Sequence, residues 1–80
     1  MTLEEIIEMF PEEEFLTADG FDGAIVGVEP NSMRLVYNRD KMIGILMTDE
    51  EMEEIDAIEY LEYNTWNAYF GEKTPIYIEI

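Results

Sequence analysis

The first segment of the chain has the hydrophobic spacing of a short helix. Four apolar side chains fall on one helix face: Leu3, Ile6, Ile7 and Phe10. Thr2 and Glu5 stand three residues apart, as the two partners of a capping box do, and the ring of Pro11 cannot follow within a continuing helix. The pattern therefore predicts a helix over residues 2–10.

A hairpin pattern follows. The run 23–28 (GAIVGV) is small and β-branched, and residues 33–37 alternate between the two faces of a strand. Residues 29–32 between them form a good turn, because the proline at the second position presets φ. We expect two paired strands, with Leu35 and Tyr37 on the same face.

The C-terminal half predicts two helices and a last strand. Residues 39–48 (RDKMIGILMT) fit either a helix or a third strand, and we favour the helix. A longer helix is predicted to start at Thr48 or Asp49, because acids suit its first turns, and to run to about Asn67. Its expected core-facing residues are Ala57, Ile58, Leu61, Thr65 and Ala68. Residues 76–80 alternate as a strand.

These elements predict a single domain spanning residues 1–80, in the order α-β-β-α-α-β. The economical packing is an α+β fold in which a three-stranded antiparallel sheet is covered on one face by helices. Eighty residues bury only a thin core.

Three stretches carry a resemblance to known proteins: FLTADGFDGAIVGV, SMRLVYN followed by KMIGILM, and DAIEYLEYNTWNAYFGEKTPIYI. In them the chain resembles a group of small proteins encoded in phage and prophage genomes, and EYN followed by AYFGEKTPI is the most specific part. The resemblance implies a viral origin and action inside a bacterial host, and it supports a helix over residues 40–47. Gly44 departs from the pattern, which has a longer side chain there. No catalytic residue and no partner carries over.

The charge balance limits the possible binding partners more than any sequence motif does. Twenty acidic residues face four basic ones, for a net charge of −16. Such a surface repels nucleic acid and anionic membranes and attracts basic surfaces. Small soluble domains usually carry a net charge of magnitude about 2–8. We therefore expect a basic protein partner, and no direct contact with nucleic acid or membrane. The alternative is that the charge only keeps the protein soluble.

The sequence gives no support to a catalytic or metal-dependent role. It contains no cysteine and no histidine, which excludes disulfides, thiolate metal sites and Ser-His or Cys-His catalytic pairs. No glycine-rich phosphate loop is present. The acids between Asp49 and Glu54 are nearly consecutive and lack the central glycine of an EF-hand loop. We expect no enzymatic activity, no cofactor and no dedicated metal site.

The acids gather in two segments, with six in residues 4–14 and eight in residues 49–62. On the longer helix, Asp56, Glu59, Tyr60 and Tyr63 fall on the face opposite the core stripe. Helix carboxylates about 5–6 Å apart approximate the spacing of phosphates, and aromatic side chains often anchor interfaces. The predicted partner-binding residues are Glu53, Asp56, Glu59, Tyr60, Glu62 and Tyr63, together with Glu12, Glu13 and Glu14.

The predicted function is that of a phage-type inhibitor that mimics nucleic acid. It would occupy the basic groove of a host DNA-acting protein with a role in defence, repair or the nucleoid. For the same helix face the alternative is simple solvation, with Tyr60 and Tyr63 packed on the first helix. The sequence leaves open whether a homodimer extends the acidic face.

Two other functions remain as alternatives. An accessory subunit would dock through an apolar patch drawn from Phe10, Phe15, Phe21 and Trp66. A protein that sequesters a small signalling molecule would use the four cations, although the negative field opposes anions. We expect these cations to pair with nearby acids instead: Arg34, Arg39, Lys41 and Lys73. No apolar run reaches membrane-spanning length and the N-terminus is acidic, so a cytoplasmic location is expected, in the bacterial host if the protein is viral.

Overall fold

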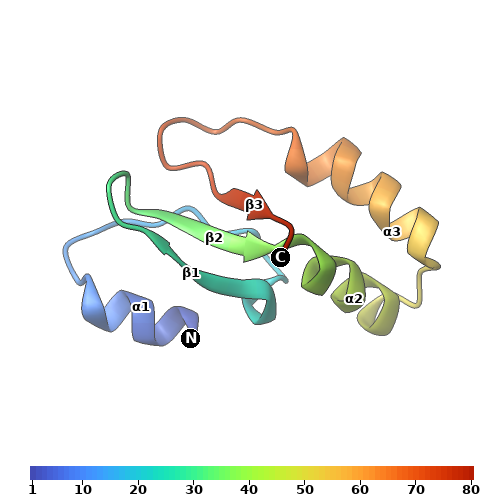
Figure 1. The fold of residues 1–80 in the computed structure, drawn as a ribbon, viewed down its shortest axis with the longest axis horizontal. Coiled ribbons are helices and arrows are strands. Elements are labelled where there is room, and N and C mark those ends of the chain that lie inside the picture. The colour runs from blue at the N-terminus through green and yellow to red at the C-terminus, as the bar shows by residue number, and fades with distance from the viewer.

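Three helices and three short strands follow one another in the predicted order (Figure 1). The computed structural model describes all residues from Met1 to Ile80. The helices and strands are α1 (Leu3–Met9), β1 (Ile25–Glu29), β2 (Arg34–Asn38), α2 (Arg39–Asp49), α3 (Glu54–Leu61) and β3 (Ile76–Ile78). A 3₁₀ turn (Asp22–Ala24) precedes β1, and a π-helical turn (Glu62–Trp66) extends α3. The order α-β-β-α-α-β and the α+β class are confirmed.

The first helix begins with the capping box that the sequence predicts. The backbone N–H of Glu5 donates to the Thr2 hydroxyl at 3.2 Å, and the Thr2 backbone N–H donates to the Glu5 carboxylate at 2.9 Å. These bonds satisfy two N–H groups that a helix start otherwise leaves without partners. Ile6 is the only residue of α1 that is fully buried.

The hairpin of β1 and β2 is antiparallel, and its register runs from Ile25 opposite Tyr37 to Glu29 opposite Arg34. A register shift between Ile25 and Gly27 interrupts the ladder. The Glu29 carboxylate holds the connecting turn, because it accepts hydrogen bonds from the backbone N–H groups of Asn31 and Ser32. A hydrogen bond from the Ser32 hydroxyl at 2.7 Å, together with these two, holds the pKa of Glu29 below its ordinary value.

The sheet is mixed, so the expectation of a fully antiparallel sheet is wrong. Its strand order is β1-β2-β3, and β3 runs parallel to β2, with Val36 opposite Ile76 and Asn38 opposite Ile78. The chain leaves β2, passes through two helices and returns beside the same strand, and a crossover of this kind makes neighbouring strands parallel. The Arg34 side chain donates to the backbone carbonyl of Thr74 and fixes the approach to β3.

Residues 39–49 are helical, which confirms the preference for a helix over a third strand. The Asn38 side chain caps this helix by accepting from the backbone N–H of Lys41 at 3.1 Å. The predicted start of the next helix is wrong. Thr48 and Asp49 close α2, Glu51 takes a left-handed conformation with φ of 54°, and α3 starts only at Glu54. A left-handed residue at this place ends a helix and turns the chain back.

The core lies against the face of β2 that carries Leu35 and Tyr37, as the alternation predicts. Each helix contributes side chains without exposed surface: Ile6 from α1, Met42 from α2, and Ala57 and Leu61 from α3. Figure 1 shows α1 along the hairpin, whereas α2 and α3 extend beyond the end of β2. Residues of all three helices belong to the same core as Leu35 and Tyr37.

Candidate functional site

The acidic face of α3 is open to solvent, and we define it by Glu53, Asp56, Glu59, Tyr60, Glu62 and Tyr63. All six residues are exposed. Tyr63 is 91% exposed and Tyr60 is 44% exposed, so neither tyrosine packs on α1. The opposite face of the helix carries the buried Ala57 and Leu61. Asp56, Glu59 and Tyr60 lie on α3, Glu53 is its N-cap, and Glu62 and Tyr63 belong to the π turn that follows, where they lie close to Glu59.

The carboxylates of the acidic face have no ion-pair partner. The two ion pairs of the protein join Arg39 to Glu79 at 3.9 Å and Lys73 to Glu13 at 2.8 Å. The Arg34 side chain bonds to a backbone carbonyl instead. Glu53, Asp56, Glu59 and Glu62 follow each other at intervals of three residues, and like charges at this spacing repel. No basic residue lies in the last turn of the helix to offset this repulsion.

The second predicted acidic segment lies elsewhere. Glu12, Glu13 and Glu14 are exposed and follow α1. Figure 1 shows the chain after α1 near one end of the long axis, whereas α3 lies near the other end. Glu13 is in addition neutralised by Lys73. The nine predicted residues therefore do not form one continuous surface, because the six along α3 and the π turn lie apart from the other three.

A π-helical turn directly follows α3 and contains the last two residues of the acidic face, Glu62 and Tyr63. In a π turn the backbone hydrogen bond spans five residues, so side chains beyond it are displaced around the axis. Trp66 there donates its indole N–H to the Met42 sulfur at 3.4 Å, and the Arg39 guanidinium lies 4.7 Å from its ring centre. The Asn67 side chain donates to the Glu62 carbonyl at 2.9 Å. Such turns are frequent at functional sites, and no pattern in the sequence predicted a π turn here.

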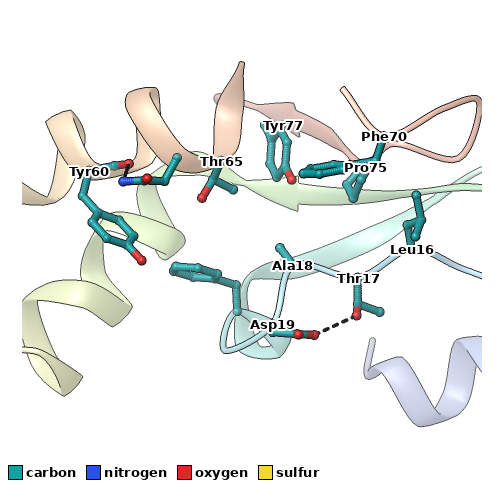
Figure 2. Close-up of a pocket in the computed structure, with 11 residues that line it drawn as sticks. Leu16, Thr17, Ala18, Asp19, Tyr60, Thr65, Phe70, Pro75 and Tyr77 are labelled. Atoms are coloured by element: carbon teal, nitrogen blue, oxygen red, sulfur yellow. Dashed lines mark hydrogen bonds between the residues drawn. The ribbon is translucent and has the colours of Figure 1, made fainter. Parts of the chain in front are cut away.

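A cleft of about 350 Å³ opens beside the acidic face, and Tyr60 belongs to both (Figure 2). Residues 16–19 form one wall of the cleft. Asn64 and Thr65 of the π turn line it together with Tyr60, and Phe70, Pro75 and Tyr77 come from the C-terminal chain. We call it the Tyr60 cleft.

The Tyr60 cleft is apolar with a few polar groups. The hydroxyls of Tyr60, Thr65 and Tyr77 line it, and none of the three makes a hydrogen bond within the protein. Burial raises the pKa of Tyr77 above its ordinary value of 10.0. Asp19 is the only charged residue of the lining, and no lysine or arginine contributes to it. The sequence held no spacing that would have predicted this cleft.

The apolar residues nominated for docking are in the wrong place for that role. Phe21 belongs to the core, and Phe10, Phe15 and Trp66 pack against it. The most exposed aromatic side chains are instead Tyr63, Tyr69 and Phe70, at 91%, 77% and 69% exposure. Tyr69 is therefore a surface residue. Phe70 stands at the edge of the Tyr60 cleft.

The four basic side chains differ in the groups that they contact. Lys73 and Arg39 pair with acids, as predicted, whereas Arg34 bonds to a carbonyl and Lys41 is exposed without an ion pair. No three carboxylates converge in a way that would hold a metal ion. None of the helices has the length and apolar character needed to cross a bilayer.

Comparison of the chain with protein-family models, curated proteins and solved structures found no match. The resemblance to phage and prophage proteins therefore stays a prediction. The acidic face and the Tyr60 cleft are the features of the molecule that bear on its function.

Proposed function

We propose that the protein binds a basic, nucleic-acid-binding protein through the acidic face of α3 and competes there with nucleic acid. The observation that supports this proposal is the row Glu53, Asp56, Glu59 and Glu62, which is exposed and unpaired. A bacterial DNA-acting protein is the expected partner if the phage resemblance holds.

The energetics favour a cationic partner over simple solvation. Like charges three residues apart destabilise a helix by about 0.2–0.5 kcal/mol per pair. A basic groove would relieve this repulsion, and the net charge of −16 would steer it to the surface. Tyr63 lies beside Glu59 and Glu62 at the C-terminal end of the acidic row, and it supplies the aromatic contact that binding hot spots favour.

The test is an affinity capture from bacterial lysate at low salt, followed by displacement with duplex DNA. The variant Asp56→Lys, Glu59→Lys, Glu62→Lys reverses the acidic face. A matched control reverses three exposed acids around α1: Glu4→Lys, Glu8→Lys and Asp22→Lys. We expect the wild type and the control to capture proteins that DNA displaces, and the α3 variant to lose them. Equal capture by both variants would refute a specific acidic face.

An accessory subunit that docks through apolar contacts is the second candidate, because Tyr69 and Phe70 are exposed side by side in the sequence. Salt separates the two functions. Screening weakens the electrostatic complex strongly, since the Debye length falls from about 10 Å at 0.1 M salt to about 3 Å at 1 M. An apolar complex would survive the same change. A nucleotide-binding role gains no support, because the Tyr60 cleft has no cation to hold a phosphate.

A further inference from the structure

The Tyr60 cleft adds to the acidic face a feature that nucleic-acid mimicry by charge alone does not need. At about 350 Å³ it lies at the small end of the range of ligand pockets, about 300–1,000 Å³. It is large enough for a side chain and too small for an extended segment. Its walls are mainly apolar and its single charge is negative.

We propose that the Tyr60 cleft takes one arginine side chain of the basic partner. This inference deepens the proposed function and rests on it for the partner. The methylene stem of arginine would lie along Leu16 and Pro75, and the guanidinium would reach the Asp19 carboxylate. Leu16 and Asp19 lie at the two ends of the wall that residues 16–19 form, and Figure 2 shows Pro75 close to the Leu16 end.

Charge complementarity chooses the occupant. The Asp19 carboxylate accepts a hydrogen bond from the Thr17 hydroxyl at 3.2 Å, and both residues line the cleft. A guanidinium adds two parallel hydrogen bonds to a carboxylate, which an ammonium or a neutral group cannot do. An anion would be repelled by the same carboxylate and by the net charge of −16 on the protein.

The aromatic and hydroxyl groups suit the same occupant. Phe70 and Tyr60 offer partly exposed ring faces beside the cleft, and a guanidinium stacks on such faces. Guanidinium carries five N–H donors and no acceptor. The hydroxyl oxygens of Thr65 and Tyr77 can accept hydrogen bonds from the N–H groups that do not bond to Asp19. Arginine is also among the residues enriched in protein interfaces.

The test is a titration of the ¹⁵N-labelled full-length chain with blocked amino acids, followed by NMR. The probes are N-acetyl-arginine-N-methylamide, its citrulline analogue of the same shape without charge, and N-acetyl-glutamate-N-methylamide. We expect the arginine probe to bind in the millimolar range and to shift the amides of residues 16–19 and of Thr65 and Tyr77. The citrulline probe should bind several-fold more weakly and the glutamate probe should not bind.

Two variants separate a specific cleft from general acidity. Asp19→Asn removes the carboxylate of the cleft, and Asp22→Asn removes a nearby exposed carboxylate that does not line it. Only Asp19→Asn should weaken the arginine probe, by about tenfold, which corresponds to the loss of one charge-assisted hydrogen bond. Both substitutions keep the shape of the side chain, so both proteins should fold as the wild type does.

Several results would overturn the inference. These are equal binding of the citrulline probe, equal effects of the two asparagine variants, absence of saturable shifts in the cleft, and shifts spread over all acidic surfaces. The proposed function has a separate outcome. If reversal of the α3 acids abolishes capture while Asp19→Asn behaves as Asp22→Asn, the acidic face stands and the arginine cleft fails. If only Asp19→Asn weakens binding of the arginine probe while the α3 reversal leaves capture unchanged, the arginine cleft stands and the acidic face fails.

Discussion

The phenol oxygen of Tyr37 accepts a hydrogen bond from the backbone N–H of Ala18 at 2.8 Å. Tyr37 is fully buried in the central strand, and its ring centre lies 5.7 Å from that of Tyr77 in the neighbouring strand. Ala18 belongs to the wall of the Tyr60 cleft. One buried hydroxyl therefore ties the cleft to the middle of the sheet.

Tyr37→Phe should destabilise the fold by about 1–3 kcal/mol, because it leaves the partly buried N–H of Ala18 without a protein partner. Urea unfolding measures this loss, and hydrogen exchange at Ala18 should accelerate. Tyr77→Phe is the matched control, since the Tyr77 hydroxyl makes no hydrogen bond within the protein. Similar losses for the two variants would contradict the role given to the Tyr37 hydroxyl.

Arg39→Met should change the environment of Trp66 more than it changes stability. The substitution removes a guanidinium 4.7 Å from the indole centre and a long, exposed pairing with Glu79. It also removes a buried Nε that has no hydrogen-bond partner, which offsets part of the loss. We expect a net destabilisation below about 1 kcal/mol together with a shift in the fluorescence of this single tryptophan. Lys41→Met, on the same helix, should leave the emission unchanged.

The turn between β1 and β2 should weaken in acid. Hydrogen bonds from Ser32 and Asn31 hold the pKa of Glu29 below its ordinary value of 4.5. The folded state thus prefers the ionised form, so this contribution to stability is present above about pH 4.5 and is lost as the pH falls through the lowered pKa. Glu29→Gln should therefore be less stable than the wild type near neutral pH, and the difference should shrink at about pH 3. Thermal melts across this range measure it. With Glu72→Gln, a change at an exposed acid that makes no hydrogen bond, the difference from the wild type should stay small.

Salt should stabilise the isolated protein. With a net charge of −16 and only two ion pairs, repulsion among the acids outweighs attraction in the folded state. The Debye length falls from about 30 Å at 0.01 M to about 8 Å at 0.15 M salt, so the melting temperature should rise over this range. The variant with three lysines on α3 should show a smaller rise. A melting temperature that falls with salt would mean that attractive pairs dominate.

The local elements could be predicted from the sequence because they depend on neighbours in the chain. The capping box of Thr2 and Glu5 and the Asn38 cap of α2 join residues three positions apart. The hairpin likewise follows from its turn and from the alternation that buries Leu35 and Tyr37. The exposed row on α3 was predictable because the buried residues Ala57 and Leu61 mark the opposite face.

The direction of β3 and the arrangement of the helices could not be read in this way. A strand pattern is the same for a parallel and an antiparallel neighbour, and the crossover through α2 and α3 decided between them. The left-handed turn at Glu51 likewise carries none of the usual glycine or asparagine signals.

By itself, then, the sequence determined the order of the elements, the acidity and which face of α3 is solvated, because these properties follow from local spacing and from charge. Only the tertiary structure decided that Glu12, Glu13 and Glu14 lie apart from α3 and that a cleft forms beside Tyr60. That cleft brings residues 16–19 together with the π turn and the chain around β3, which follow them by about forty to sixty positions. Their meeting depends on how the whole chain packs, and no short-range pattern records it.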